Sequence, residues 1–238
     1  MPPRKKKDRF VLSQTYEQPT PEIEDEILEA YSDVLGEDKD EEEDQDLRLS
    51  HLPQVFRILK IPRVFVRDIE TAIEYYYNHM GTKTGTIDRA NAKQSITFDM
   101  LESYTITSPT VKTHAEILDI VDIDKLIRNL TRLVKFRDNF AHIKSSWQLF
   151  LEHSGSKVAN IENFKMELPQ LKSVKTQLNL DNDQHTGERL SDGFMIDMLG
   201  CCKLDSRERL LNFEFKSGGA SVGIKDFAEI LGRIGEFD

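Results

Sequence analysis

The sequence predicts a mainly α protein made of two lobes of paired EF-hand-like helix–loop–helix units, with short β pairings and degenerate calcium sites. The first observation behind this prediction is a pattern that occurs near residues 47, 121 and 222. In each copy, apolar residues alternate and then take helical spacing, which indicates a short strand that leads directly into an amphipathic helix. The second observation is that an amphipathic stretch precedes each copy, as an entering helix would.

The repeat sets the register of three loops. In an EF-hand, loop position 8 pairs with its counterpart in a mini-sheet, and position 13 begins the apolar face of the exiting helix. By this register, position 8 is Leu47 in the first copy, Val121 in the second and Val222 in the third. Position 13 of the same three copies is Leu52, Leu126 and Phe227.

Two entering helices are predicted in the first half of the chain. Thr20 suits a helix cap, Pro21 the first helical position, and the glutamates that follow favour the positive helix end. This helix ends at Gly36. A second helix is expected over 62–77. The apolar faces of the two helices are Ile23, Ile27, Tyr31 and Val34, and Phe65, Ile69, Ala72, Ile73 and Tyr76.

A third hand is expected over 147–178, between the second and third copies of the repeat. Its register is ambiguous between Ile161 and Phe164, and Pro169 falls early in its exiting helix. Because residues 126–153 contain no Pro or Gly, the chain there forms either one long helix or a bent pair, which Ser154 and Gly155 end.

The predicted domain organisation has three parts. Residues 1–19 form a basic disordered tail, residues 20–138 an N-terminal EF-hand-like lobe, and residues 139–238 a C-terminal EF-hand-like lobe. The N-terminal lobe carries an insertion at about 78–119, which is rich in Thr, Gly, Asn and Lys. We expect this insertion to be a mobile excursion, with possible local structure over 95–105.

Composition narrows the class of protein. The chain has 238 residues, a formal net charge of −10, and no apolar run long enough to span a bilayer. The negative net charge disfavours binding of the phosphate backbone of duplex DNA over a large surface, and it favours a basic protein as the partner. The run from Arg4 to Lys7 is either a nuclear import signal or a solvated charge run. Adjacent Cys201 and Cys202 indicate neither a disulfide framework nor a metal site.

The loops do not suit calcium. Asp40, Glu42, Asp44 and Asp46 stand at positions 1, 3, 5 and 7 of the first loop, which is a plausible ligand set. However, position 6 is Gln45 instead of the glycine of a sharp turn. Position 12, which needs a bidentate carboxylate, is His51 in the first loop and Lys125 in the second. In the fourth loop position 12 is Asp226, but position 1 is Phe215. We therefore expect no metal and no cofactor.

Four segments carry a family resemblance: PEIEDEILEAYSDVL, LSHLPQVFRILKI, IVDIDKLIRNLTRLV and SVGIKDFAEILGRIG. Together they resemble the small fungal nucleotide-excision-repair accessory proteins of the centrin and calmodulin superfamily. The resemblance covers about 19–34, 47–77, 121–153 and 193–237. It implies a nuclear protein that binds and stabilises an XPC-type DNA-damage recognition subunit.

The favoured function is a non-enzymatic adaptor. Paired hands can form an apolar groove that binds an amphipathic helix of the partner, so DNA would be contacted only indirectly and the chain alone would be a monomer. We place the groove in the C-terminal lobe, although any single apolar residue on such helices more often packs in the core. The candidate residues are Trp147, Phe150, Leu151, Leu168, Leu171, Met195, Met198, Phe227, Ile230, Leu231 and Ile234.

Three other functions compete with the adaptor. A calcium sensor is disfavoured by the loop ligands. An enzyme is disfavoured because the six histidines are scattered and no GxSxG, HExxH or P-loop pattern occurs. An unrelated helical scaffold subunit of a nuclear complex would explain the helical periodicity without the repeated strand–helix pattern.

Overall fold

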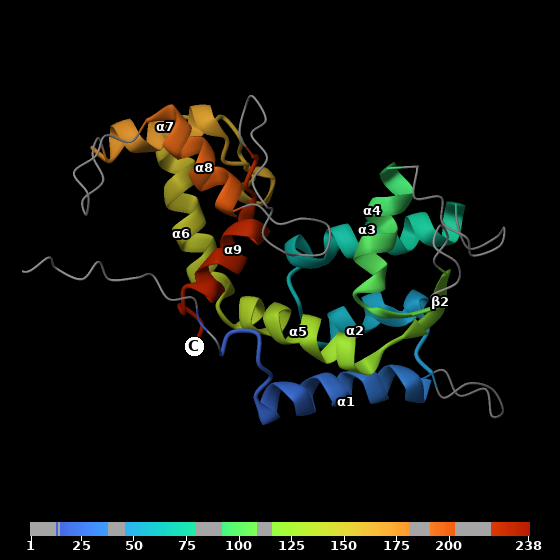
Figure 1. The fold of residues 1–238 in the computed structure, drawn as a ribbon. Coiled ribbons are helices and arrows are strands. Elements are labelled where there is room, and N and C mark those ends of the chain that lie inside the picture. The colour runs from blue at the N-terminus through green and yellow to red at the C-terminus, as the bar shows by residue number, and fades with distance from the viewer. Residues whose placement is uncertain are drawn as a thin grey trace, which may run out of the picture.

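The computed structural model describes residue 13 and residues 15–37, 46–79, 92–108, 116–180, 191–202 and 220–238. Within these residues the protein is mainly helical with a small two-stranded sheet, which confirms the predicted mainly α class (Figure 1). Of the predicted basic tail over residues 1–19, residues 1–12 and 14 lie outside the described residues, as do residues 40–45 of the acidic loop.

The first helix, α1 (Pro21–Glu37), begins where the sequence predicts. The backbone N–H of Ile23 donates to the hydroxyl of Thr20, 3.4 Å away, which caps the helix. Ile27 and Val34 are buried on its predicted apolar face, while Tyr31 packs partly buried against the core. α1 therefore contributes one side of the core through the periodicity visible in the sequence.

The next elements are η1 (Leu49–His51), α2 (Leu52–Ile58) and α3 (Arg63–His79). The predicted helix over 62–77 corresponds to α3. All five residues of its predicted apolar face are buried, namely Phe65, Ile69, Ala72, Ile73 and Tyr76. The periodicity of this segment was therefore a correct guide to its packing.

The inserted segment differs from the expected excursion. It contains α4 (Ala92–Glu102) and β1 (Thr105–Ser108), which pairs antiparallel with β2 (Glu116–Val121). Three of its side chains, Phe98, Leu101 and Tyr104, are buried in the main core. These three side chains make the segment over 92–108 part of the packed structure, although Ile96 and Ile106 remain 50% and 40% exposed.

The long segment after β2 forms the bent pair of helices, α5 (Ile123–Asp138) and α6 (Phe140–His153). Asp122 caps α5 by accepting from the backbone N–H groups of Asp124 and Lys125. Asn139 separates the two helices, and its side-chain amide donates to the carbonyl of Lys135, 2.9 Å away. Ile123, which the apolar alternation after Val121 placed in the short strand of the second copy, belongs instead to the first turn of α5.

The remaining elements are η2 (Ile161–Asn163), α7 (Leu168–Gln177), α8 (Asp192–Cys202) and α9 (Ile224–Arg233). Pro169 stands in the first turn of α7, where its missing N–H costs nothing. The residue of the third loop that pairs with Val222 is Met166, and not Ile161 or Phe164 as predicted. Met166 and Val222 form an antiparallel bridge. Phe164 instead packs on Trp147, with ring centroids 5.2 Å apart.

One apolar core runs through both halves of the described chain. Figure 1 shows α6 to α9 on one side of the molecule and α1 to α5 on the other. Phe65 of α3 joins them, with its ring centroid 5.1 Å from Phe136 and 5.6 Å from Phe140. The break at Asn139 falls where the predicted lobes meet, and the division into two lobes stays a prediction.

Alkaline pH is expected to unfold the protein through its tyrosines. Burial raises the pKa of four hydroxyls, those of Tyr16, Tyr76, Tyr77 and Tyr104. In the unfolded chain these groups ionise near pH 10 (about the model-peptide value), so the unfolded state loses protons first. Stability is therefore fully present below about pH 10 and falls as the pH rises further. Melting temperatures measured from pH 7 to 11 would show this decline.

A matched variant isolates one of these groups. The hydroxyl of Tyr104 is buried and has no hydrogen-bond partner within the described residues. Tyr104→Phe removes the ionisable hydroxyl and keeps the ring, so its melting temperature should fall less steeply above pH 10 than that of the parent chain. Parallel declines in the two proteins would contradict this assignment.

Candidate partner-binding surface

Three of the predicted groove residues lie inside the C-terminal half and not on its surface. Trp147, Leu151 and Met195 are buried. Trp147 is the centre of an aromatic cluster, with its ring centroid 5.8 Å from Phe150 and 5.0 Å from Phe227. These residues form the layer beneath the surface. Replacing them with smaller side chains would create a cavity in the core.

The other predicted residues are accessible to different degrees. Met198 is exposed, and Ile230 and Ile234 are half-buried. A further set packs against the core while part of each side chain reaches the surface, consisting of Phe150, Leu168, Leu171, Phe227 and Leu231. The structure thus divides the predicted groove into a supporting layer and an accessible layer.

Two large apolar side chains of α8 are also exposed. Phe194 and Met198 are 45% and 42% exposed. Because they are four residues apart, they lie one turn apart on one helix face, and we name them the α8 stripe. Met195 and Leu199 on the neighbouring face are buried. Sequence reasoning missed Phe194 as a site residue, because the apolar spacing alone does not distinguish the two faces.

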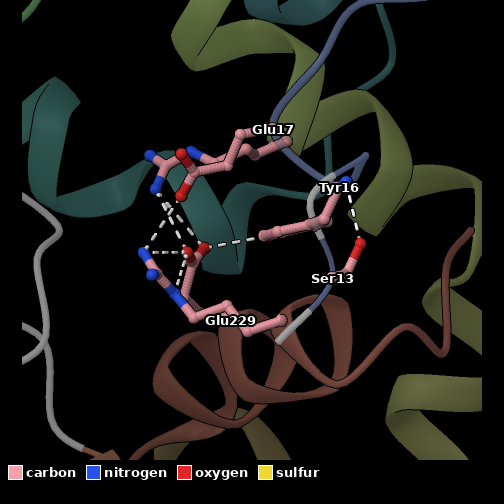
Figure 2. A network of polar contacts seen from close by, with 6 residues as sticks. Ser13, Tyr16, Glu17 and Glu229 are labelled. Atoms are coloured by element: carbon pink, nitrogen blue, oxygen red, sulfur yellow. Dashed lines mark hydrogen bonds and ion pairs between the residues drawn. The ribbon is translucent and has the colours of Figure 1, made fainter. Parts of the chain in front are cut away.

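The face of α9 that lies away from Phe227 is fixed by a buried polar network. Glu229 is 1% exposed, and its carboxylate accepts from the hydroxyl of Tyr16 at 2.9 Å. Figure 2 shows these two side chains pointing toward each other. Nη1 of Arg132 on α5 lies 3.4 Å from both carboxylate oxygens, and Nη2 of Arg233 lies 2.8 Å from one. The network therefore holds α9 against α5 and sets the orientation of its apolar face.

The second loop places a lysine where a calcium-binding loop needs a carboxylate. Nζ of Lys125 donates to the carbonyl oxygens of Glu102 and Thr105, at 3.0 and 2.8 Å. The side-chain ammonium group of Lys125 thus donates hydrogen bonds to two backbone carbonyl groups at the turn between α4 and β1. In the fourth loop, Asp226 accepts from the N–H of Gly223, 2.8 Å away, and so caps α9.

Replacing Lys125 by methionine is expected to lower the free energy of unfolding by about 1–2 kcal/mol. The substitution keeps most of the apolar stem and leaves two carbonyl groups without their donor. Urea denaturation followed by circular dichroism would measure the change. Lys144→Met on the exposed surface of α6 is the control, with an expected change within about 0.5 kcal/mol. Equal effects of the two substitutions would contradict the assigned role.

A separate cavity of about 680 Å³ lies between α2 and α3. Its lining is apolar at Phe56, Ile61 and Val66 and charged at its rim, where Arg63 pairs with Glu70 at 3.3 Å. The sequence analysis did not predict this hollow. Its position in the N-terminal half means that it is distinct from the residues predicted for the groove.

Two kinds of feature are absent from the described residues. Among them, no group of three or more His, Cys, Asp or Glu side chains is arranged to hold a metal ion. None of the helices described has the length and apolar character needed to cross a bilayer.

Comparison with known proteins decides the family. A model of the Rad33 family matches residues 13–183, which is more than half of the chain. The chain belongs to the Rad33 family. Membership in the Rad33 family indicates a role in nucleotide excision repair and a nuclear site of action. No curated protein and no solved structure matches the chain. The Rad33 match ends before α8 and α9, so the α8 stripe lies outside it.

Proposed function

We propose that this chain is a non-enzymatic nuclear adaptor of nucleotide excision repair. In this proposal it binds and stabilises an XPC-type damage-recognition subunit by holding one amphipathic helix of that partner, without calcium. The observation that carries the proposal is the α8 stripe, two large apolar side chains exposed beside the partly accessible apolar face of α9. Exposed neighbouring apolar groups of this size are typical of protein-binding surfaces.

The EF-hand-like arrangement is part of the proposal. Met166 and Val222 exchange both backbone hydrogen bonds, at 2.8 and 2.9 Å, as an antiparallel pair does. In the N-terminal half, the N–H of Val121 donates to the carbonyl of Leu47, 2.8 Å away. Each half therefore joins two loops through one short contact. Three of these four residues are those that the sequence repeat assigns to loop position 8.

The apolar groups are sufficient for useful affinity. Burying one large side chain stabilises a complex by about 1.5–3 kcal/mol. Two or three such anchors, after the costs of association and ordering, give dissociation constants on the order of micromolar to nanomolar. Met198 suits this role, because a flexible thioether adapts to different partner surfaces.

Calcium independence is supported by the groups that occupy the loops. The ammonium of Lys125 already binds two carbonyl oxygens, and Asp226 is engaged in capping α9. Neither loop offers the bidentate carboxylate that a calcium site requires at its twelfth position. Isothermal titration of the full chain with calcium is expected to give no binding isotherm. Binding in the micromolar range would favour a calcium sensor and overturn this part of the proposal.

The direct test is capture of the proposed partner. The full chain, immobilised at micromolar concentration, is expected to retain the C-terminal part of an XPC-type subunit. Retention should persist in the presence of a calcium chelator and resist moderate salt, since the contact is mainly apolar. A peptide of the same composition with its apolar residues scrambled is the control. Absence of a complex at micromolar concentrations would remove the repair adaptor and favour a helical scaffold in another complex.

A further inference from the structure

The segment before α1 is bound to the far end of the chain. The N–H of Ser13 donates to the carbonyl of Arg233, 2.7 Å away. Nζ of Lys135 on α5 donates to the carbonyls of Thr15 and Tyr16, at 3.1 and 2.9 Å. We name Ser13, Thr15, Tyr16 and Glu17 the N-terminal latch, because these residues join α5 and α9.

Tyr16 is the anchor of the latch. It is 1% exposed, and its ring centroid lies 6.3 Å from that of Phe136 and 6.4 Å from that of Phe237. Gly232 makes room for it, since a Cβ at that position would lie 2.1 Å from the Tyr16 ring. The buried hydroxyl of Tyr16 donates to Glu229, as Figure 2 shows. The fit is therefore specific for an aromatic side chain with a hydroxyl.

At the surface the latch is held by one carboxylate. The hydroxyls of Ser13 and Thr15 both donate to Oδ1 of Asp238, each at 2.8 Å. These hydrogen bonds, with a smaller contribution from Lys135, lower the pKa of Asp238, so the carboxylate is ionised at neutral pH. The Ser13 oxygen also accepts from the N–H groups of Thr15 and Tyr16, at 3.2 and 3.1 Å. Ser13 therefore organises the turn that presents Tyr16.

We propose that Ser13 is a phosphorylation site and that its phosphate releases the N-terminal latch from α9. This inference goes beyond the proposed function and does not depend on it. Ser13 is only half-buried, whereas the anchor Tyr16 is enclosed. In the sequence Ser13 precedes Gln14, and a serine followed by glutamine is the short sequence that glutamine-directed protein kinases recognise.

The chemical step is a phosphoryl transfer from a nucleoside triphosphate. The Ser13 oxygen forms a bond to the γ-phosphorus, and the bond from that phosphorus to the β–γ bridging oxygen breaks. The nucleoside diphosphate leaves, and the hydroxyl proton passes to the base of the kinase. The product carries about 1.5 to 2 negative charges at neutral pH.

The local charges decide the direction of the effect. The phosphate would stand where the Ser13 hydroxyl now donates to ionised Asp238, so a hydrogen bond is replaced by like-charge repulsion. The nearest cations are engaged. Lys135 donates to two latch carbonyls, and Arg233 pairs with Glu17 at 3.3 Å and with Glu229. Lys135 keeps its positive charge and helps to lower the pKa of Asp238, so it offsets part of the repulsion, but its hydrogen bonds go to carbonyl groups and not to the carboxylate.

The test uses the full chain with phosphoserine encoded at position 13, compared with the unmodified chain by hydrogen exchange. Amides of the latch and of α9 are expected to exchange at least about tenfold faster in the phosphorylated protein. Phosphoserine encoded at exposed Ser145 of α6 is the control and should leave the latch protected. Unchanged protection of the latch in the Ser13 phosphoprotein would overturn the proposal.

Two further arms separate release from general unfolding. Asp238→Asn in the Ser13 phosphoprotein removes the repelling charge and is expected to restore most of the latch protection. Failure of this rescue would contradict the assigned mechanism. A glutamine-directed kinase with ATP should label Ser13 of the full chain and not a Ser13→Ala variant. Labelling confined to Thr176, which also precedes a glutamine, would exclude Ser13 as the site.

Discussion

Replacing Glu229 by alanine is expected to lower the free energy of unfolding by about 3–5 kcal/mol, because it removes the buried carboxylate that faces the buried guanidinium of Arg132. The side chains of Arg132 and Glu229 are 9% and 2% exposed. The substitution also removes the acceptor of the Tyr16 hydroxyl, which then has no partner in its enclosed site. Urea denaturation followed by circular dichroism would measure the loss.

Two comparisons make the Glu229 experiment specific. Glu236→Ala removes an exposed carboxylate just after α9 and should change stability by less than about 0.5 kcal/mol. The double variant Arg132→Met with Glu229→Leu removes both buried charges, so it should be more stable than Glu229→Ala alone. A loss below about 1 kcal/mol for Glu229→Ala would show that the network contributes little to stability.

The sequence was a good guide to the helices and to their buried faces. α1 begins at the predicted cap, and the whole predicted apolar face of α3 is buried. These features follow from local rules, since the period of apolar residues and the chemistry of the first turn act within one helix. The sequence also predicted a bent pair of helices as one of two alternatives, because the absence of Pro and Gly over 126–153 indicates helix without showing whether that helix bends.

The features that the sequence missed depend on residues far apart in the chain. The bridge of Met166 to Val222 joins positions 56 residues apart, and apolar alternation is too short there to fix the register. Phe98 and Leu101 of α4 stand in a largely polar segment, and only their contact with distant helices shows that they belong to the core. The network around Glu229 was missed because charged residues at helical spacing are usually solvated.

The candidate surface shows the same limit. Helical spacing correctly marked α8 and α9 as helices with apolar positions, but it did not show which apolar side chains remain accessible once the helices pack. Trp147 and Met195 face inward, whereas Met198, three residues after Met195, is exposed. Accessibility is decided by the neighbouring helices α6 and α7, whose contacts the sequence does not specify.

The double substitution of Phe194 and Met198 by aspartate is expected to weaken capture of the proposed partner by about 100-fold or more. Each of the two side chains would lose about 1.5–3 kcal/mol of apolar burial in the complex, and each carboxylate would be desolvated. Because both are already more than two-fifths exposed, the isolated chain should keep its fold. Titration of the partner segment, with circular dichroism of each variant, would measure both effects.

Leu149→Asp provides the matched control for this experiment. Leu149 is 58% exposed on α6, two residues after buried Trp147 and so on the opposite side of that helix. A carboxylate at this position adds one of the two negative charges that the double variant adds, and it should leave partner capture within about threefold of the parent chain. Substituting Phe227 would be less informative, because it packs on Trp147 and its loss would disturb the core. Equal weakening by Leu149→Asp and by the double variant would indicate an electrostatic effect of net charge and place the partner elsewhere on the molecule.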